Sequence, residues 1–143
     1  MTIPDHKIKE IAEWLETGMM VFYCKETGEI KYHPDPDDPY FDPEPWQEEI
    51  DNIERDREKY LRFESMESRQ SFKVMEHFAD SLSDLKFKGM VYDRLSRKKP
   101  FQNFKMLVER SDYRQDWFDF RDNATLEWVK EQLEDYEKEN YID

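Results

Sequence analysis

Residues 19–32 read MMVFYCKETGEIKY, and this stretch decides the fold class. We expect one strand over residues 19–23 and a second over residues 29–32. The residues KETG at 25–28 separate them, and Gly28 can supply the positive φ that a short hairpin loop with a bulge requires. The stretch therefore predicts an antiparallel hairpin. The residues expected to face the core are Phe22, Ile30 and Tyr32.

A two-stranded hairpin is marginally stable alone, so it needs a third strand or a helix behind it. Residues 61–64 alternate apolar and polar side chains and are predicted to form that strand. A first helix is indicated before the hairpin, because its apolar residues recur at i, i+3, i+4 and i+7 and Gly18 follows as a C-terminal glycine. Its apolar face comprises Ile8, Ile11, Ala12 and Leu15.

The chain after residue 45 carries mostly helical periodicity. Ser68 is expected to cap one helix, and Pro100 opens another. A break is expected near Asn123, with one long helix as the alternative. The predicted apolar stripes are Trp46/Ile50/Ile53/Tyr60, Phe72/Met75/Phe78/Ala79/Leu82, Phe87/Val91/Leu95, Phe101/Phe104/Leu107/Val108, Tyr113/Trp117/Phe120 and Leu126/Val129/Leu133/Tyr136.

These elements predict a mostly helical α+β fold, in which a small antiparallel hairpin or three-stranded sheet packs against about five to six helices. The length of 143 residues fits a single domain over residues 1–143. Residues 33–45 contain five prolines and are expected to form a Pro/Asp-rich surface connection pinned by Tyr40 and Phe41.

Composition places the chain among folded proteins of the cytoplasm. Charged residues make up 40% and aromatic residues 15%, whereas disordered chains combine high charge with few aromatics. Cys24 is the one cysteine, so no internal disulfide can form, and we expect it to be a small buried apolar residue. No apolar run approaches the ~20 residues of a membrane span, and the N-terminus lacks an export segment.

The formal net charge is −13, but the charge is unevenly distributed. Residues 86–114 contain nine bases and three acids, so the remainder of the chain carries −19. Residues 35–58 alone contain eleven acids and two bases. A field of this kind repels nucleic acid and anionic membranes and speeds encounter with basic partners.

Several chemistries are excluded or unsupported. Three glycines leave no phosphate-cradling loop, and no serine occupies a Gly-x-Ser-x-Gly turn. The histidines at 6, 33 and 77 lack the spacing of a zinc site. The acidic run in the 33–45 connection lacks the glycine of an EF-hand loop. The sequence therefore predicts no metal, no cofactor and no catalytic residue.

A basic run precedes the helix that begins at Pro100. Cations beside a helix N-terminus attract anions, including phosphate, although ion pairs with acids elsewhere are the structural alternative. The candidate anion-binding residues are Arg97, Lys98, Lys99 and Lys105. Most aromatic residues fall on core stripes, whereas Phe118 lies off the Trp117/Phe120 stripe and is the best candidate for an exposed contact.

Several motifs, taken in order, resemble a bacterial group known as uncharacterised protein family 0158, over roughly residues 10 to 137. They are residues 23–30 (YCKETGEI), 60–62 (YLR), 68–70 (SRQ), 100–105 (PFQNFK) and 114–122 (RQDWFDFRD). The resemblance implies a small bacterial intracellular protein, with no established activity, cofactor or catalytic residue. Lys98-Lys99 stands where the family's commoner pattern has a glycine-containing turn, and Cys24 where an acidic residue is usual.

The leading hypothesis is a non-catalytic binding domain that engages another protein through an acidic surface. Its candidate residues are Asp37, Asp38, Glu48 and Glu49. One alternative is binding of nucleic acid or another polyanion through the basic residues 86–114. A second alternative is a metal-dependent hydrolase. No membrane partner is expected, and the sequence sets no oligomeric state.

Overall fold

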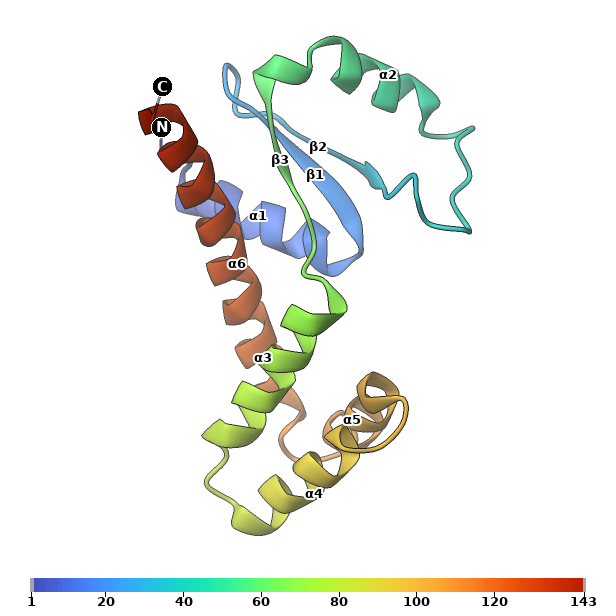
Figure 1. Cartoon of the computed structure of the whole chain (residues 1–143), viewed down its shortest axis with the longest axis vertical. Coiled ribbons are helices and arrows are strands. Elements are labelled where there is room, and N and C mark those ends of the chain that lie inside the picture. The colour runs from blue at the N-terminus through green and yellow to red at the C-terminus, as the bar shows by residue number, and fades with distance from the viewer. Residues whose placement is uncertain (1, 143) are drawn as a thin grey trace. The chain divides into compact units, whose positions relative to one another are not determined.

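The computed structural model describes the backbone of residues 2–142 and the side chains of residues 2–139 (Figure 1). The chain divides into two compact units: unit 1 comprises residues 1–65 and 125–143, and unit 2 comprises residues 66–124. The expectation of one domain over residues 1–143 stays a prediction. The elements are α1 (Asp5–Glu16), β1 (Met19–Cys24), β2 (Ile30–Pro34), α2 (Gln47–Arg55), the 3-10 turn η1 (Arg57–Lys59), β3 (Tyr60–Phe63), α3 (Ser68–Ser81), α4 (Leu85–Leu95), α5 (Pro100–Val108) and α6 (Arg114–Ile142).

The sheet of unit 1 is three-stranded and antiparallel, with strand order β2-β1-β3. The mostly helical α+β fold and the predicted third strand are therefore confirmed. Val21 of β1 is paired with Tyr32 of β2 on one side and with Phe63 of β3 on the other. Gly28 has φ +75°, and its N–H donates to the Cys24 carbonyl across the hairpin loop at 2.8 Å. The predicted role of Gly28 in that loop is thus also confirmed.

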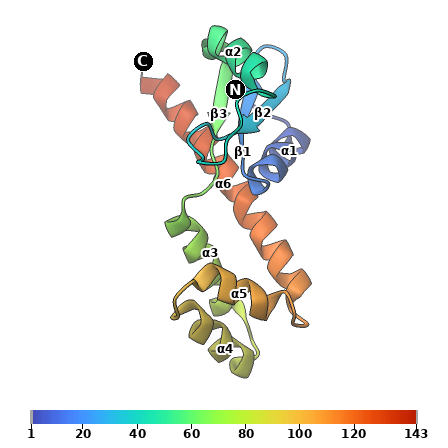
Figure 2. The same ribbon diagram turned by 90° about the vertical axis from the view of Figure 1, so that its right-hand side faces the viewer.

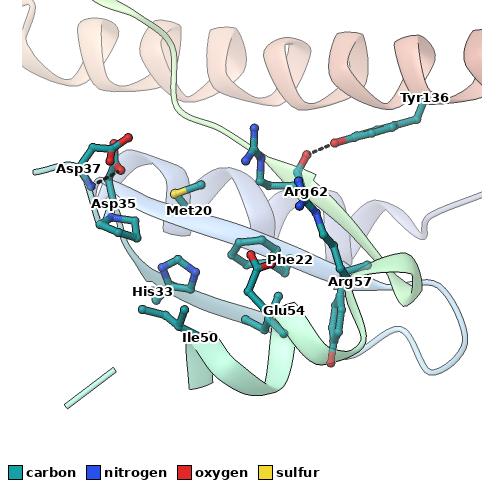
Figure 3. A pocket seen from close by; sticks show the side chains of 13 residues that line it. Met20, Phe22, His33, Asp35, Asp37, Ile50, Glu54, Arg57, Arg62 and Tyr136 are labelled. Carbon is teal, nitrogen blue, oxygen red and sulfur yellow. Dashed lines mark hydrogen bonds between the residues drawn. The ribbon is translucent and has the colours of Figure 1, made fainter. Parts of the chain in front are cut away.

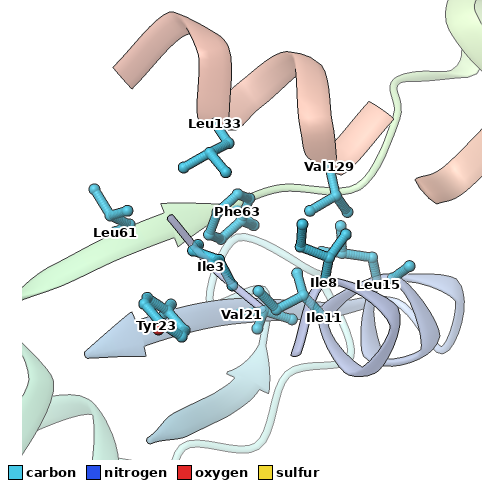
Figure 4. Close-up of a cluster of buried hydrophobic side chains, with 11 residues drawn as sticks. Ile3, Ile8, Ile11, Leu15, Val21, Tyr23, Leu61, Phe63, Val129 and Leu133 are labelled. Atoms are coloured by element: carbon cyan, nitrogen blue, oxygen red, sulfur yellow. The ribbon is translucent and has the colours of Figure 1, made fainter. Parts of the chain in front are cut away.

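One face of the sheet packs on α1 and on the C-terminal half of α6 (Figure 4). The buried side chains of this core are Ile3, Ile8, Ile11, Ala12, Leu15, Val21, Tyr23, Leu61, Phe63, Val129 and Leu133. Phe22 is buried, as expected of a core-facing residue, but it does not share a face with Ile30 and Tyr32. Phe22 is paired with Lys31 and therefore points to the opposite face, because successive side chains of a strand alternate. Both faces of this sheet are covered, so both carry apolar residues.

The outer edge of β3 is closed by side chains of α6. The Tyr136 hydroxyl donates to the Arg62 carbonyl, and the Trp128 indole N–H donates to the Glu64 carbonyl at 2.7 Å. The Gln132 amide oxygen accepts from the Glu64 backbone N–H at 2.9 Å. An exposed strand edge is a template for unwanted pairing, and these bonds satisfy its polar groups within unit 1.

Unit 2 contains α3, α4, α5 and the beginning of α6. Its core is aromatic: Phe78 of α3 makes edge contacts with Phe104 and Trp117, at centroid distances of 6.2 and 5.3 Å. These residues belong to three of the predicted stripes, and Val91 of α4, which is fully buried, belongs to a fourth. The cap of α3 differs from expectation: Glu67 occupies the N-cap and forms a capping box with Gln70.

The expected break near Asn123 is wrong, because α6 is continuous over residues 114–142 (Figure 2). Trp117 is buried in the core of unit 2, whereas Val129 and Leu133 are buried in the core of unit 1. The division between the units falls at Thr125, close to the expected break. The stripe changes face there, but no glycine or proline interrupts the backbone ladder, so the helix continues.

The N-terminus of α4 is held by Asp84. Its carboxylate accepts from the Phe87 backbone N–H at 3.0 Å and from the Tyr113 hydroxyl at 2.8 Å. These two bonds, the backbone bond foremost, lower the pKa of Asp84 below its ordinary value of 3.8. A lowered carboxyl pKa contributes stability that is present above pH 3.8 and is lost as the pH falls through the folded-state pKa.

We therefore expect Asp84→Asn to flatten the acid limb of the stability profile. Asparagine is as good an N-cap as aspartate but does not titrate. The urea midpoint of the parent protein should fall more than that of the variant between about pH 6 and about pH 2. Parallel midpoints across that range would show that this carboxyl contributes nothing to acid sensitivity.

Candidate binding surface and pocket

The acidic excess of the chain lies in unit 1. Its residues comprise 25 acids and 10 bases, a formal charge of −15. Unit 2 comprises 12 bases and 10 acids, a formal charge of +2. The polarity expected from the sequence therefore coincides with the division of the chain into units.

The densest acidic part of unit 1 is residues 35–54, whose carboxylates we call the acidic surface. In the connection between β2 and α2, the carboxylates of three aspartates each accept a hydrogen bond from the backbone N–H two residues later. The carboxylate of Asp35 accepts from the N–H of Asp37 at 2.9 Å, that of Asp38 from Tyr40 at 2.8 Å, and that of Asp42 from Glu44 at 3.1 Å. These local turns fix the loop while the acids remain exposed.

Tyr40 stands at the middle of this loop with 94% of its surface exposed. The expectation that Tyr40 pins the connection is therefore wrong, and Phe41 is only half-buried. The Tyr40 ring therefore contributes no packing to the fold, and its surface is available for contact with a partner.

The four predicted acidic residues fall on two parts of this surface. Asp37 and Asp38 lie in the exposed loop, and Glu48 is exposed in the first turn of α2. Glu49 instead turns towards the sheet, where its carboxylate lies 3.9 Å from the Lys31 ammonium. Burial opposes the charge on Lys31, but Glu49 and the neighbouring Tyr60 outweigh it and raise the pKa of Lys31.

The predicted basic residues lie at the N-terminus of α5 and along it. Lys98 and Lys99 are exposed, and Lys105 is exposed on α5. Arg97 is paired with Asp93 at 2.7 Å, which is the structural alternative considered for this run. Lys99 has φ +53°, in the left-handed region that favours glycine.

Phe118 is half-buried rather than an open contact. Its ring lies between two guanidinium groups, those of Arg114 at 5.2 Å and Arg121 at 4.9 Å from the ring centre. Arg121 is also paired with Asp122 at 3.1 Å. The ring is thus covered by cation–π contacts within unit 2.

Sequence reasoning missed a pocket of about 480 Å³ on the face of the sheet opposite α1 (Figure 3). Met20 and Phe22 of β1, His33 of β2 and Ile50 of α2 line it. The signal was present, since the alternation of β1 places residues 20 and 22 on one face. Because β1 is apolar on both faces, the alternation does not show which residues share a face with which neighbours until the pairing register is known.

His33 is the buried polar residue of this pocket, with 4% of its surface exposed. Its ring stacks on Phe22 with a centroid distance of 5.0 Å. Nδ1 lies 2.7 Å from the Pro34 carbonyl oxygen. Because a carbonyl only accepts, Nδ1 carries the proton in that bond, and Nε2 of the neutral ring is an acceptor.

Comparison with known proteins supports the resemblance seen in the sequence. The profile described as "Uncharacterised protein family (UPF0158)" matches residues 39–142. The chain belongs to this family. It is also 28% identical over 84 residues to UPF0158 protein PA5073 of Pseudomonas aeruginosa, a match that covers 58% of this chain and 55% of the relative. The match thus spans about half the length of that curated relative. No solved structure matches the chain.

The UPF0158 match includes all of unit 2 and, in unit 1, α2, η1, β3 and the part of α6 that follows residue 124. Glu48, Glu49 and the four basic candidates therefore lie within it, whereas Asp37 and Asp38 precede it.

Three further features of this UPF0158 chain bear on chemistry. Cys24 is buried, and hydrogen bonds led by that of the Thr27 hydroxyl lower the pKa of its thiol. Among the residues the structure describes, no three His, Cys, Asp or Glu side chains gather to hold a metal ion. Nor does any helix in that part of the chain have the length and apolar character needed to cross a membrane.

Proposed function

We propose that this chain is a non-catalytic, cytoplasmic protein-binding domain whose acidic surface engages a basic protein. The observation that carries the proposal is the exposure of Tyr40, 94% open to solvent among carboxylates held outward by their own turns. Tyrosine is enriched among the residues that dominate binding energy at interfaces, and surrounding charges select the partner.

The charge distribution supports a basic partner in particular. Unit 1 carries −15, so its field attracts a cationic protein before contact and raises the association rate. The acids of residues 35–48 are exposed and serve no ion pair within the described residues, so their charge is available to a partner. Exposed carboxylates also keep an acidic protein hydrated without any partner. A binding measurement distinguishes this role from partner binding.

We expect the variant Asp37→Asn/Asp38→Asn/Glu48→Gln/Glu49→Gln to lose the partner. The tagged protein would be used to capture proteins from lysate of its own cells, and the association rate of the captured protein would then be measured. The loss of four carboxylates should slow association by about 10- to 100-fold at low salt. Asparagine retains the loop-forming turns of aspartate, so the fold should persist by circular dichroism.

The matched control is Glu131→Gln/Glu134→Gln/Asp135→Asn/Glu137→Gln on exposed positions of α6. Both variants change the formal charge from −13 to −9. Equal slowing in both would reduce the effect to net charge and reject the acidic surface as the site. An unchanged rate in both would reject it outright.

The alternative function, binding of nucleic acid or another polyanion through residues 86–114, has its own supporting observation. Lys98 and Lys99 are exposed beside the N-terminus of α5, in the unit whose net charge is positive. Nuclease treatment of the capture distinguishes it. If the captured material disappears with nuclease, the assignment moves to Arg97, Lys98, Lys99 and Lys105.

A further inference from the structure

We propose that the pocket on the outer face of the sheet binds a small zwitterion, of the class of a short peptide with a free amino group and a free carboxylate. The pocket lies within unit 1, between the sheet, α2 and the start of the connection (Figure 3). Its volume of about 480 Å³ falls within the range of small-molecule sites.

The middle of the pocket is apolar and largely buried. Phe22 is 7% exposed and Ile53 is 2% exposed, and Met20 and Ile50 complete this surface. The Phe22 ring is held by its stack with His33, so this part of the pocket is formed before any ligand arrives. Such a surface contacts the apolar body of a ligand.

One end of the pocket is cationic. Arg57 of η1 and Arg62 of β3 lie together at that end in Figure 3. Arg62 is paired with Glu64, but the Arg57 guanidinium makes no ion pair within the described part of the chain. Glu54 also lines the pocket, and Arg57 therefore provides the guanidinium of this end that is free of an ion pair among the described residues. A guanidinium binds a carboxylate through two parallel hydrogen bonds, so Arg57 is the carboxylate-binding group.

The opposite end is acidic, since Asp35 and Asp37 lie on the far side of the pocket from Arg57 and Arg62 (Figure 3). One Asp35 oxygen accepts from the Asp37 N–H. The second Asp35 oxygen and the Asp37 carboxylate remain to receive an ammonium group. A ligand with only one kind of charge would satisfy one end and be repelled by the other, so the two ends together select a zwitterion.

This site goes beyond the proposed protein-binding function, although Asp35, Asp37 and Glu54 belong to both. Arg57 is not part of the acidic surface, so a variant of it tests the pocket alone. Arg55 supplies a matched control, because it is exposed on the last turn of α2 and does not line the pocket.

The test uses dipeptides with free ends: Gly-Gly, Ala-Ala, Leu-Ala, Met-Ala and Phe-Ala, each added to the whole protein at up to about 5 mM, a concentration suited to weak binding. Binding is followed by the side-chain NMR signals of Met20 and His33. At least one apolar dipeptide should shift them saturably, and its C-amidated form should bind at least about tenfold more weakly. Arg57→Gln should show the same loss with the free dipeptide, and Arg55→Gln should bind as the parent does.

Three outcomes would overturn the proposal: no saturable shift with any of the five dipeptides, equal binding of the amidated form, or equal affinity of the Arg57→Gln and Arg55→Gln variants. Because the acidic surface is intact in both arginine variants, their capture of a protein partner reports separately on the proposed function.

Discussion

The variant Phe78→Ala should lose about 3–5 kcal/mol of unfolding free energy, one of the two largest effects expected in this chain. Phe78 is 2% exposed and lies at the centre of the aromatic core of unit 2. Its ring contacts Phe104, Trp117 and Phe120 at centroid distances of 6.2, 5.3 and 5.6 Å. Truncation removes the transfer energy of the ring and leaves a cavity that three large neighbours cannot close. Urea unfolding followed by circular dichroism gives the difference.

The control for this prediction is Leu85→Ala at the exposed start of α4. Leu85 is 78% exposed, so its truncation should change the unfolding free energy by no more than about 0.5 kcal/mol. Hydrogen exchange should show the loss of protection in residues 66–124. If the two variants were equally stable, the aromatic cluster would not be the core of unit 2.

A loss of about 3–5 kcal/mol is likewise expected for Phe63→Ala, in the core of unit 1. Phe63 is 0% exposed, is paired with Val21 across the sheet and contacts the Tyr136 ring edge-on at 6.1 Å. The strand β3 is held by this side chain and by the Tyr136 hydroxyl on the Arg62 carbonyl. Loss of the ring therefore weakens both the packing and the closed edge of the sheet.

Tyr40→Ala provides the comparison for unit 1, because an aromatic side chain of similar size is removed from a fully exposed position. It should leave the urea midpoint unchanged. For Phe63→Ala, exchange protection should fall in β1, β2 and β3 first. Retention of that protection, with a midpoint like that of Tyr40→Ala, would contradict the packing described for Phe63.

Local patterns were sufficient wherever one face of an element is buried and the other is solvated. The apolar stripes of α1, α3 and α5 were predicted correctly, since a helix with one buried face shows a clear period. The hairpin followed from Gly28 and its flanking residues. The sequence favours Ser68 as the cap because serine is the more common N-cap, whereas the structure has Glu67 there, in a capping box with Gln70.

Prediction failed for elements that are buried on more than one face. Because β1 is apolar on both faces, its pattern predicts that Phe22 is buried but not on which face, and only the pairing with Lys31 fixes its side. The break expected in α6 reflects the same limit. The two apolar stripes of α6 pack into two different cores. In the sequence, a change of the apolar face within one helix has the same pattern as the end of one helix and the start of another.

The candidate site divides in the same way. The acidic candidates could be named from charge density alone, but charge density did not reveal that Tyr40 is exposed while Glu49 is paired with Lys31. The pocket could not be anticipated, because its walls come from parts of the chain as distant as β1, α2 and Tyr136 of α6.

By itself, the sequence determined the fold class, the three strands, most of the helices, the membership of UPF0158 and the asymmetry of charge, because each depends on local periodicity, motif order or composition. Tertiary structure alone decided which face of the sheet Phe22 occupies, that α6 contributes to both cores, and that Arg57 and Asp37 line one pocket. These features depend on strand register and on contacts between residues distant in the chain, which no local pattern encodes.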